Sequence, residues 1–331
     1  MTTTALLPDA AAPLEQVTAE AAFGAILDGQ VDEAEIARFL TAMAERDETS
    51  VEIAAAARAL RQRMIAITAP AGAIDVCGTG GDGAHSLNVS TAVAIVVAAC
   101  GVPVAKHGNR AASSKAGAAD TLEALGLDLS RASADGEASL SDIGIAFLFA
   151  QIHHPALARL APVRRRIGRR TIFNLIGPLA NPARVTRQLI GVALVDYLET
   201  VAGALRLIGT EGALVVAGEE SLDELSIAGP SRVVHVGDCG EGTERVAPED
   251  AGLHRHSLAA LRGGDAAYNA AALRALLDGA PGAYRDAVLL NAAGALMVAG
   301  CAEDWRDGAR QAAQSIDDGS AADLLARWIA R

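Results

Sequence analysis

The 331-residue sequence is poor in aromatic residues and in cysteine, and both shortages narrow its class. Aromatic side chains form 3% of the chain, so its core must consist mainly of Ala, Val, Leu and Ile. The four cysteines, Cys77, Cys100, Cys239 and Cys301, form no C-x-x-C pair, which argues against a zinc module and predicts buried, reduced thiols. No apolar run reaches the roughly 20 residues that a membrane-spanning helix needs.

Positive charge is also scarce, because 28 basic residues stand against 40 acidic residues and give a net charge of −12. Such a chain lacks the basic surface that binds nucleic acid without sequence preference, although a local site for a small anion is compatible with it. The first thirteen residues carry no basic side chain, so they do not form a signal peptide. We therefore expect a cytoplasmic protein with no nucleic-acid or membrane partner.

A change of pattern near residue 72 predicts two domains. Residues 1–72 show only helical periodicity, with Asp32 and Ser50 in position to cap helices. From residue 73 short β-branched runs alternate with alanine-rich helical stretches, which is the pattern of a mostly parallel sheet covered by helices. The predicted strands are residues 74–77, 102–105, 145–149, 189–194, 213–217 and 232–236. We therefore predict an α/β protein with a small all-helical domain at 1–72 and a larger α/β domain at 73–331.

A glycine-rich segment, DVCGTGGDGAHSLNVST, follows the first predicted strand at residues 75–91. Its four glycines within six residues allow positive φ angles and close backbone approach, and the helix that follows offers free N–H groups to an anion. Asn88, Ser90 and Thr91 add polar side chains in that first helical turn. The spacing fits neither a Walker A loop nor G-x-G-x-x-G. A plain tight turn is the alternative, but the clustered polar side chains favour an anion cradle.

Both lysines of the chain, Lys106 and Lys115, fall in the segment VAKHGNRAASSK at residues 104–115. We interpret this segment as a loop after the second strand, in which a compact ammonium group contacts phosphate. The alternative is a solvated basic loop.

Two further segments have chemical character. QIHHPA at residues 151–156 leads into residues 164–170, which contain five arginines. Most of these arginines are expected to be solvated or ion-paired, while one faces inward to clamp a carboxylate. EESLDELS at residues 219–226 follows a strand, where adjacent carboxylates can hold Mg²⁺ with substrate phosphates. That segment alone favours an acidic helix start, but all four together indicate one polyanionic ligand and phosphoryl or pyrophosphoryl chemistry.

The motifs GTGGDG with NVSTA, KHGNRAASS, HHPA with a downstream arginine, and RTIFNLIGPLANP resemble the anthranilate phosphoribosyltransferase family in order and spacing, from about residue 14 onward. The resemblance implies a nucleoside phosphorylase-like phosphoribosyltransferase fold, a helical stretch around 165–187 that joins the small domain, a homodimer, and two Mg²⁺ ions per subunit. It also implies transfer of the phosphoribosyl group from 5-phosphoribosyl 1-pyrophosphate to the amine of anthranilate, a step of tryptophan biosynthesis that releases pyrophosphate.

The resemblance also implies roles for individual residues. Those expected to contact phosphoribosyl pyrophosphate are Gly78, Gly81, Asp82, Ser86, Asn88, Val89, Ser90, Thr91, Lys106, His107, Gly108, Asn109, Arg110, Ala111, Ala112, Ser113, Ser114 and Ala118. Gly78, Asn109 and Arg164 match the anthranilate-binding positions, with His107, His154 and Pro178 in the channel for the aromatic acid. Ser90, Asp223 and Glu224 match the metal ligands. Ala118 stands where family members often have serine, which implies that a side-chain contact is missing there, although a backbone contact could survive.

In the expected mechanism, loss of pyrophosphate leaves an oxocarbenium-like centre, and Mg²⁺ with Lys106 stabilises the leaving group. Arg164 orients the carboxylate of anthranilate, whose amine is neutral near pH 7, so no catalytic base is assigned and His107 is the candidate if one acts. Two rival hypotheses remain open: a pyrimidine nucleoside phosphorylase of the same fold, and a non-enzymatic relative that binds nucleic acid. The first would need a nucleobase site, and the net charge opposes the second.

Overall fold

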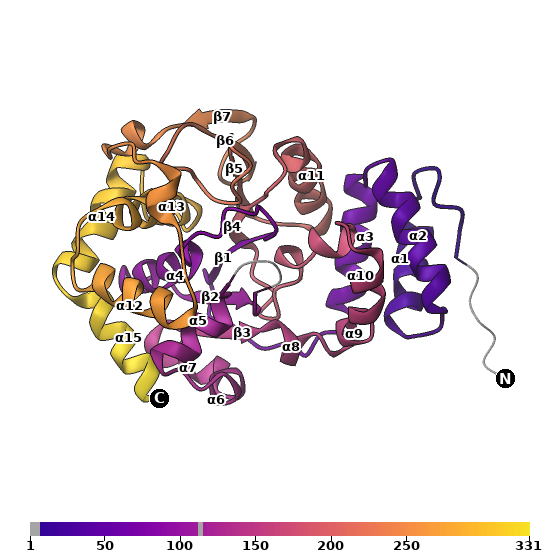
Figure 1. Cartoon of the computed structure of the whole chain (residues 1–331), viewed down its shortest axis with the longest axis horizontal. Coiled ribbons are helices and arrows are strands. Elements are labelled where there is room, and N and C mark those ends of the chain that lie inside the picture. Colours follow the sequence, from indigo (N-terminus) through magenta and orange to yellow (C-terminus); the bar gives the residue numbers. More distant parts are fainter. Residues whose placement is uncertain (1–6, 112–114) are drawn as a thin grey trace.

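The computed structural model describes residues 7–111 and 115–331 of the chain (Figure 1). Seven strands form one sheet in the order β3-β2-β1-β4-β5-β6-β7. The strands are β1 (Ile74–Gly78), β2 (Val104–Gly108), β3 (Ile145–Phe149), β4 (Arg187–Gly191), β5 (Gly212–Gly218), β6 (Ser231–Gly237) and β7 (Thr243–Val246). Strands β1 to β5 pair in parallel, whereas β6 and β7 join in antiparallel fashion. The prediction of a mostly parallel sheet is confirmed.

Strand β7 is additional to the six predicted strands, and the bounds of β2 and β4 differ from those expected. Strand β2 begins later than predicted and includes Lys106 and His107, so these residues lie inside the sheet and not in a loop. Its residues are buried on both faces up to His107, and a lysine in a doubly buried strand masks the apolar run that would have indicated it. Strand β4 spans Arg187–Gly191. It therefore begins earlier than predicted and ends before the apolar residues 192–194, which follow its carboxyl end.

Three helices open the described chain: α1 (Gln16–Leu27), α2 (Glu33–Glu45) and α3 (Ser50–Arg61). Asp32 caps α2 as predicted, because its side chain accepts from the backbone of Glu35. The cap of α3 is Thr49 and not Ser50; Thr49 forms a capping box with Glu52. The Ser50 hydroxyl instead donates to the backbone oxygen of Thr200 at 2.8 Å, which ties α3 to α11 (Leu198–Ile208).

The remaining helices surround the sheet. They are α4 (Val89–Ala99), α5 (Ala118–Leu125), α6 (Leu129–Ala134), α7 (Gly136–Ile143), α8 (Ala150–His153), α9 (Pro155–Ala158), α10 (Ala161–Ile167), α12 (Ala266–Leu277), α13 (Ala283–Val298), α14 (Trp305–Asp317) and α15 (Ser320–Ala330). Figure 1 shows α4 and α12 to α15 on one side of the sheet, and α11 with α1 to α3 on the other. Strand β5 divides accordingly, since Leu214 and Val216 belong to the first core and Ala213 and Val215 to the second.

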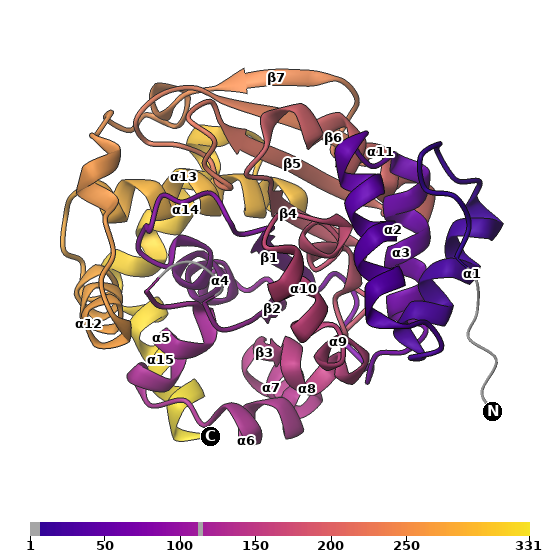
Figure 2. The same ribbon diagram turned by 45° about the vertical axis from the view of Figure 1, so that its right-hand side comes forward.

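The chain returns to the N-terminal helices between β3 and β4. Helix α10 packs against α2, and the 3₁₀ turns at Ile172–Asn174 and Pro178–Ala180 pack against α2 and α3 (Figure 2). Of the stretch expected at 165–187, only the end of α10 and these two turns are helical. One hydrophobic core runs from α1, α2 and α3 through this stretch to the sheet, so a division at residues 72 and 73 stays a prediction.

All four cysteines are free thiols, but only Cys77 is buried as predicted. Cys100 and Cys239 are half-buried and Cys301 is exposed, because they lie at the ends of helices or strands where the chain turns towards solvent. Within residues 7–111 and 115–331, no helix has the length and apolarity needed to cross a membrane.

A polar cluster joins the loop between α2 and α3 to the rest of the chain. The Tyr197 hydroxyl donates to Glu48 at 2.7 Å and accepts from Arg170 at 2.6 Å, and Arg170 also pairs with Glu48 at 2.8 Å. The Arg170 guanidinium lies over the Tyr197 ring, 4.3 Å from its centroid. Burial and the neighbouring carboxylates of Glu48 and Asp47 raise the pKa of Tyr197. The hydroxyl therefore stays protonated and holds both charges together.

We predict that Tyr197→Phe lowers the free energy of unfolding by about 1 to 3 kcal/mol, because it leaves two charged groups of this cluster without a shared partner. Thermal or urea unfolding would measure the loss. Tyr268→Phe is the matched control, since Tyr268 is 56% exposed. Equal stability of the two variants would contradict a structural role for the cluster.

Candidate active site

The sheet reverses its strand order between β1 and β4, and this point determines where a ligand can bind. From β1 the chain adds β2 and β3 on one side, and then returns to place β4 on the other side. In parallel sheets, ligands bind beyond the carboxyl ends of the strands at such a switch point. The glycine-rich segment leaves β1 at this edge, and the KHGN segment ends β2 beside it.

Two glycines end β1 and β4 and leave room for an acidic side chain. Gly78 and Gly191 are register partners across the two strands. A Cβ at Gly78 would overlap the carboxylate of Asp223, and a Cβ at Gly191 would overlap its backbone oxygen. The glycines are thus required by Asp223, which lies across both strand ends. The Asp223 carboxylate accepts from the backbone of Gly80 at 2.7 Å, which also fixes the start of the glycine loop.

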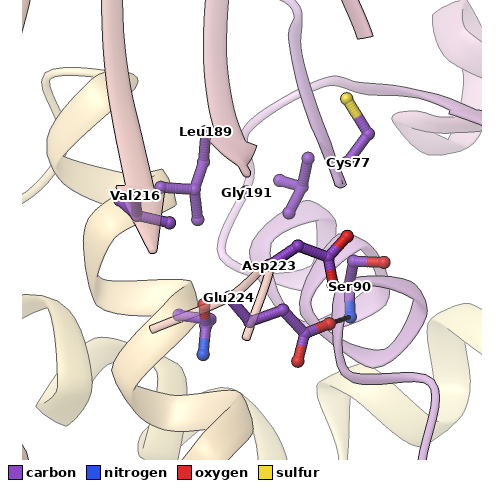
Figure 3. A pocket seen from close by; sticks show the side chains of 9 residues that line it. Cys77, Ser90, Leu189, Gly191, Val216, Asp223 and Glu224 are labelled. Carbon is purple, nitrogen blue, oxygen red and sulfur yellow. Dashed lines mark hydrogen bonds between the residues drawn. The ribbon is translucent and has the colours of Figure 1, made fainter. Parts of the chain in front are cut away.

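Glu224 lies next to this residue and faces the start of α4. Its carboxylate accepts from the backbone of Ser90 at 3.3 Å, and Figure 3 shows Asp223, Glu224 and Ser90 converging beyond the ends of the strands. Loss of solvent raises the pKa of Asp223, with Asp82 as the second cause, and it raises the pKa of Glu224, with Asp223 as the second cause. The structure thus brings Ser90, Asp223 and Glu224 together, and their role as metal ligands stays a prediction.

The carboxylate pair fits a divalent cation. No ion pair with an arginine or lysine involves Asp223 or Glu224 in the described part of the chain, and the Lys106 charge only partly offsets the rise in the pKa of Glu224. No set of three His, Cys, Asp or Glu side chains among residues 7–111 and 115–331 is arranged to hold a metal. Mg²⁺ typically needs only one or two carboxylates, because substrate phosphates and water complete its coordination.

The glycine loop has the open backbone that its sequence predicts. Gly80, Gly81 and Gly83 have φ angles of +69°, +81° and +71°, where other residues are strained. No atom outside the chain neighbours would lie within 4 Å of a Cβ at these positions, so each faces open space. Asp82 sits among them and accepts from the backbone of Ala84 at 3.1 Å. The loop is therefore open on its outer side, directly before the N-terminus of α4, where an anion would be favoured.

Lys106 is buried at the centre of this region, with 2% of its surface exposed. Its ammonium donates to the backbone oxygen of Val76 at 2.7 Å, which joins β2 to β1. Asp75 is fully buried beside it and accepts from the backbone of His107 at 3.0 Å. Burial raises the pKa of Asp75, while the Lys106 charge opposes that rise. Lys106 is thus a charge fixed below the cradle, unlike the flexible loop lysine that the sequence suggested.

The segment after β2 lies over α5. Asn109 is exposed, and its side-chain oxygen accepts from the backbone of Arg110 at 2.8 Å. The Arg110 guanidinium pairs with Asp120 at 2.8 Å and Glu123 at 2.5 Å. Ala118 is the first residue of α5. The expected contacts at Ala112, Ser113 and Ser114 lie outside the described residues.

Two buried histidine rings and a buried proline lie close to the end of β2. The rings of His107 and His154 are 5.0 Å apart between centroids, and Pro178 is buried in the turn of the GPLANP motif. Burial lowers the pKa of His154 to about 4 and that of His107 well below its usual range, so both rings are neutral near pH 7. Neutral rings suit a channel for an aromatic ligand.

Helix α10 and the residues after it show what the arginine cluster does. Arg166, Arg169 and Arg170 pair with the N-terminal helical region through Glu33, Glu45 and Glu48. Arg164 is half-buried, and its side chain has no ion pair or hydrogen bond in the part of the chain described. Burial lowers its pKa, but the group stays charged. Of the five arginines, Arg164 and Arg165 have no carboxylate partner among the described residues, and of these two only Arg164 is half-buried. Its role as a carboxylate clamp stays a prediction.

Comparison with known proteins relates this site to solved structures and curated sequences. A family model described as "Glycosyl transferase family, a/b domain" matches residues 71–322, and one described as "Glycosyl transferase family, helical bundle domain" matches residues 10–64. The anthranilate phosphoribosyltransferase of Novosphingobium aromaticivorans is 61% identical over 325 residues, which is 98% of each chain. The chain belongs to the anthranilate phosphoribosyltransferase family.

Solved structures of the family have the same fold. The crystal structure of the anthranilate phosphoribosyltransferase from Thermus thermophilus is 42% identical, with a TM-score of 0.91 over 97% of this chain and 96% of that one. The Saccharomyces cerevisiae member in complex with phosphoribosyl pyrophosphate and Mg is 28% identical, with a TM-score of 0.87 over 96% and 93%. The expected fold, a helical bundle joined to an α/β unit, is confirmed, and the comparisons favour this family over both rival hypotheses.

Sequence reasoning missed several buried polar residues that hold the site of this family member. Asn181 donates to Asp75 and to the backbone of Ala105, both at 2.8 Å, and so ties the GPLANP turn to two strands. Asn291 on α13 accepts from the backbone N–H of Leu225 at 2.9 Å and donates to its carbonyl at 3.0 Å, which fixes the residue after Glu224. Asparagines far along the chain give no local signal, because only folding reveals their partners.

We predict that Gly191→Ala weakens both stability and activity, because the added methyl group must displace the backbone of Asp223. The expected loss of unfolding free energy is about 2 kcal/mol or more. Gly229→Ala is the matched control, since a Cβ there meets nothing within 4 Å and its φ is not positive. Thermal unfolding and steady-state turnover would both detect the change, and a Gly191→Ala protein that matches the control would contradict this role for the glycine.

Proposed function

We propose that this chain transfers the phosphoribosyl group of 5-phosphoribosyl 1-pyrophosphate to the amine of anthranilate and releases pyrophosphate, as one step of tryptophan biosynthesis. Membership of the family supports this reaction, and so does the name of each curated relative at 50 to 61% identity. The observation that carries the assignment within the site is Arg164, the one half-buried arginine of its cluster without a carboxylate partner. A fluorescence assay of anthranilate consumption, with and without phosphoribosyl pyrophosphate and Mg²⁺, tests it directly.

The glycine loop and the start of α4 hold the phosphoribosyl pyrophosphate in this proposal. Positive φ angles at Gly80 and Gly81 keep the loop open, and Asn88 to Thr91 form the start of α4 directly after it. Lys106 adds a positive charge within β2, where its ammonium donates to the backbone oxygen of Val76. The positive end of α4 and this ammonium together favour an anion over a neutral ligand.

Asp223, Glu224 and Ser90 hold Mg²⁺ in the proposal, and we expect two ions per subunit. The Saccharomyces cerevisiae member binds phosphoribosyl pyrophosphate and Mg, which supports the same metal here. When bound, Mg²⁺ neutralises charge that develops on the pyrophosphate leaving group. The chain's own contribution is to keep both carboxylates in place through Gly80, Ser90 and the glycine pair of β1 and β4.

Anthranilate lies between the KHGN segment and α10 in the proposal. Arg164 pairs with its carboxylate, Asn109 faces its polar edge, and His107, His154 and Pro178 line its ring. Such an arrangement aims the amine at the anomeric carbon of the ribose, and positioning of this kind contributes much of the rate enhancement. We assign no general base, because the lowered pKa of His107 makes it a weak proton acceptor near pH 7.

We also propose that the protein is a homodimer and acts in the cytoplasm. The homodimer rests on the resemblance to the family, and light scattering coupled to gel filtration would test it. The four free thiols support the cytoplasm, where reducing conditions keep cysteines unpaired.

Replacement of Arg164 should change the KM for one substrate and not for the other. We expect Arg164→Ala to raise the KM for anthranilate by about 10-fold or more, because a charged hydrogen bond to the carboxylate is lost, and to leave the KM for phosphoribosyl pyrophosphate within about twofold. Arg165→Ala is the control on the same helix, since Arg165 is exposed. Equal rises in both KM values would remove Arg164 from the clamp.

Neutralising the carboxylate pair should change the metal requirement. We expect Asp223→Asn with Glu224→Gln to raise the Mg²⁺ concentration for half-maximal activity by about 10-fold or more. Glu219→Gln is the matched control, because Glu219 pairs with Arg245 at 2.8 Å in the same segment. Binding of Mn²⁺ in the presence of phosphoribosyl pyrophosphate, followed by electron paramagnetic resonance, gives a second readout, and an unchanged metal titration would contradict the assignment.

A further inference from the structure

Asn269 is a buried side chain on α12 that links two parts of the site. It is 2% exposed, although α12 lies almost two hundred residues after the glycine loop in the sequence. Its amide nitrogen donates to the side-chain oxygen of Asn88 at 2.9 Å. Its amide oxygen accepts from the backbone of Gly264 at 2.8 Å. Each end of the amide thus has one partner, and the two partners belong to different segments.

The first partner, Asn88, is held on several sides. Its side-chain oxygen accepts from the Thr121 hydroxyl at 2.5 Å as well as from Asn269, so both acceptor positions of that oxygen are filled. The Tyr284 hydroxyl donates to its backbone oxygen at 3.1 Å. These bonds fix which way the Asn88 amide faces, so its nitrogen is turned towards the segment after β2, where the backbone oxygen of Ala116 lies 3.4 Å away.

The second partner belongs to a segment that supports the glycine loop from outside. Gly263 donates to the backbone of His85 at 2.8 Å, and the backbone of Leu87 donates to Leu261 at 2.8 Å. This short antiparallel pairing includes a bridge between Ser86 and Arg262. A Cβ at Gly263 would lie 2.7 Å from the backbone oxygen of Ser86 and 3.0 Å from the Asn269 oxygen. The segment fits closely between the loop and α12.

We propose that Asn269 is a positioning residue for phosphoribosyl pyrophosphate. It acts through Asn88, because it sets the direction of the Asn88 amide. It also acts through Gly264, which follows the segment 261–263 that pairs with residues 85–87 of the glycine loop. The inference rests on the proposed function for the ligand, but it adds a residue from an element that none of the ligand-binding motifs includes. Because both contacts are to the phosphoribosyl pyrophosphate side of the site, the effect should be confined to that substrate.

Two substitutions test the two hydrogen bonds of the Asn269 side chain, one to Asn88 and one from Gly264. Asn269→Asp keeps an oxygen that accepts from Gly264 but replaces the donor to Asn88 with a second oxygen, which repels the Asn88 oxygen. Asn269→Leu removes both hydrogen bonds at similar volume. Isothermal titration with phosphoribosyl pyrophosphate and Mg²⁺, without anthranilate, should show a rise in Kd of about 10-fold or more for each variant. The KM for anthranilate should stay within about twofold.

Arg274→Ala on the same helix is the control for a general loosening of α12. Arg274 donates to the backbone oxygen of Leu125 at 2.7 Å and contacts neither Asn88 nor the glycine loop. Thr121→Val removes the other donor to Asn88 and should raise the same Kd, which keeps the test valid if the Asn269 variants fold poorly.

Binding within about twofold of wild type for both Asn269 variants and for Thr121→Val would overturn the proposal. The proposal would also be overturned if the Asn269 variants weakened binding of both substrates equally, and if Arg274→Ala, at the same melting temperature, weakened binding by the same amount. If wild type bound phosphoribosyl pyrophosphate but did not consume anthranilate, the proposed function would fail, while the binding comparison would still decide the role of Asn269.

Discussion

The position of Asp223 across the ends of two neighbouring strands is the constraint on which the rest of the site depends. Gly78 and Gly191 pair in register, and the space left by their missing side chains is filled by this one acidic residue. Its carboxylate also fixes Gly80, so the carboxylate pair and the glycine loop share a single support. Any side chain at either glycine would separate them.

Charged side chains lie both within the sheet below Asp223 and beyond the ends of its strands. Lys106 and Asp75 lie buried within the sheet, while Asp223 and Glu224 lie beyond the strand ends and form no ion pair with a described residue. Buried charges are tolerated when hydrogen bonds satisfy them, as Val76 does for Lys106. Asp223 and Glu224 each accept one backbone hydrogen bond, from Gly80 and Ser90. Burial and repulsion among neighbouring carboxylates still raise their pKa values, and a divalent cation would relieve that repulsion. The acidic total of the chain is thus compatible with a site for anions.

Much of the fold could be predicted from the sequence, because alternating apolar runs and glycine turns report a parallel sheet directly. The features that the sequence predicted wrongly have physical causes. Lys106 hid the extent of β2, since a charged residue in a doubly buried strand breaks the apolar pattern. Thr49 replaced Ser50 as a helix cap, because the capping box with Glu52 satisfies one more backbone group. The arginine cluster looked uniform in sequence, and only packing distinguished Arg164 from its paired neighbours.

The sequence alone determined the class of the protein and which loops carry its chemistry, because glycine, lysine and paired carboxylates occur there in a specific order. Only the tertiary structure decided how these loops are held. Asn181, Asn269 and Asn291 act over long sequence distances through hydrogen bonds to backbone and side-chain groups of other segments. Such bonds leave no local pattern, since an asparagine in a helix looks the same whether it faces water or supports a site. The sequence pattern placed Lys106 in a loop after the second strand. The fold instead buries it within β2, where its ammonium donates to the backbone oxygen of Val76.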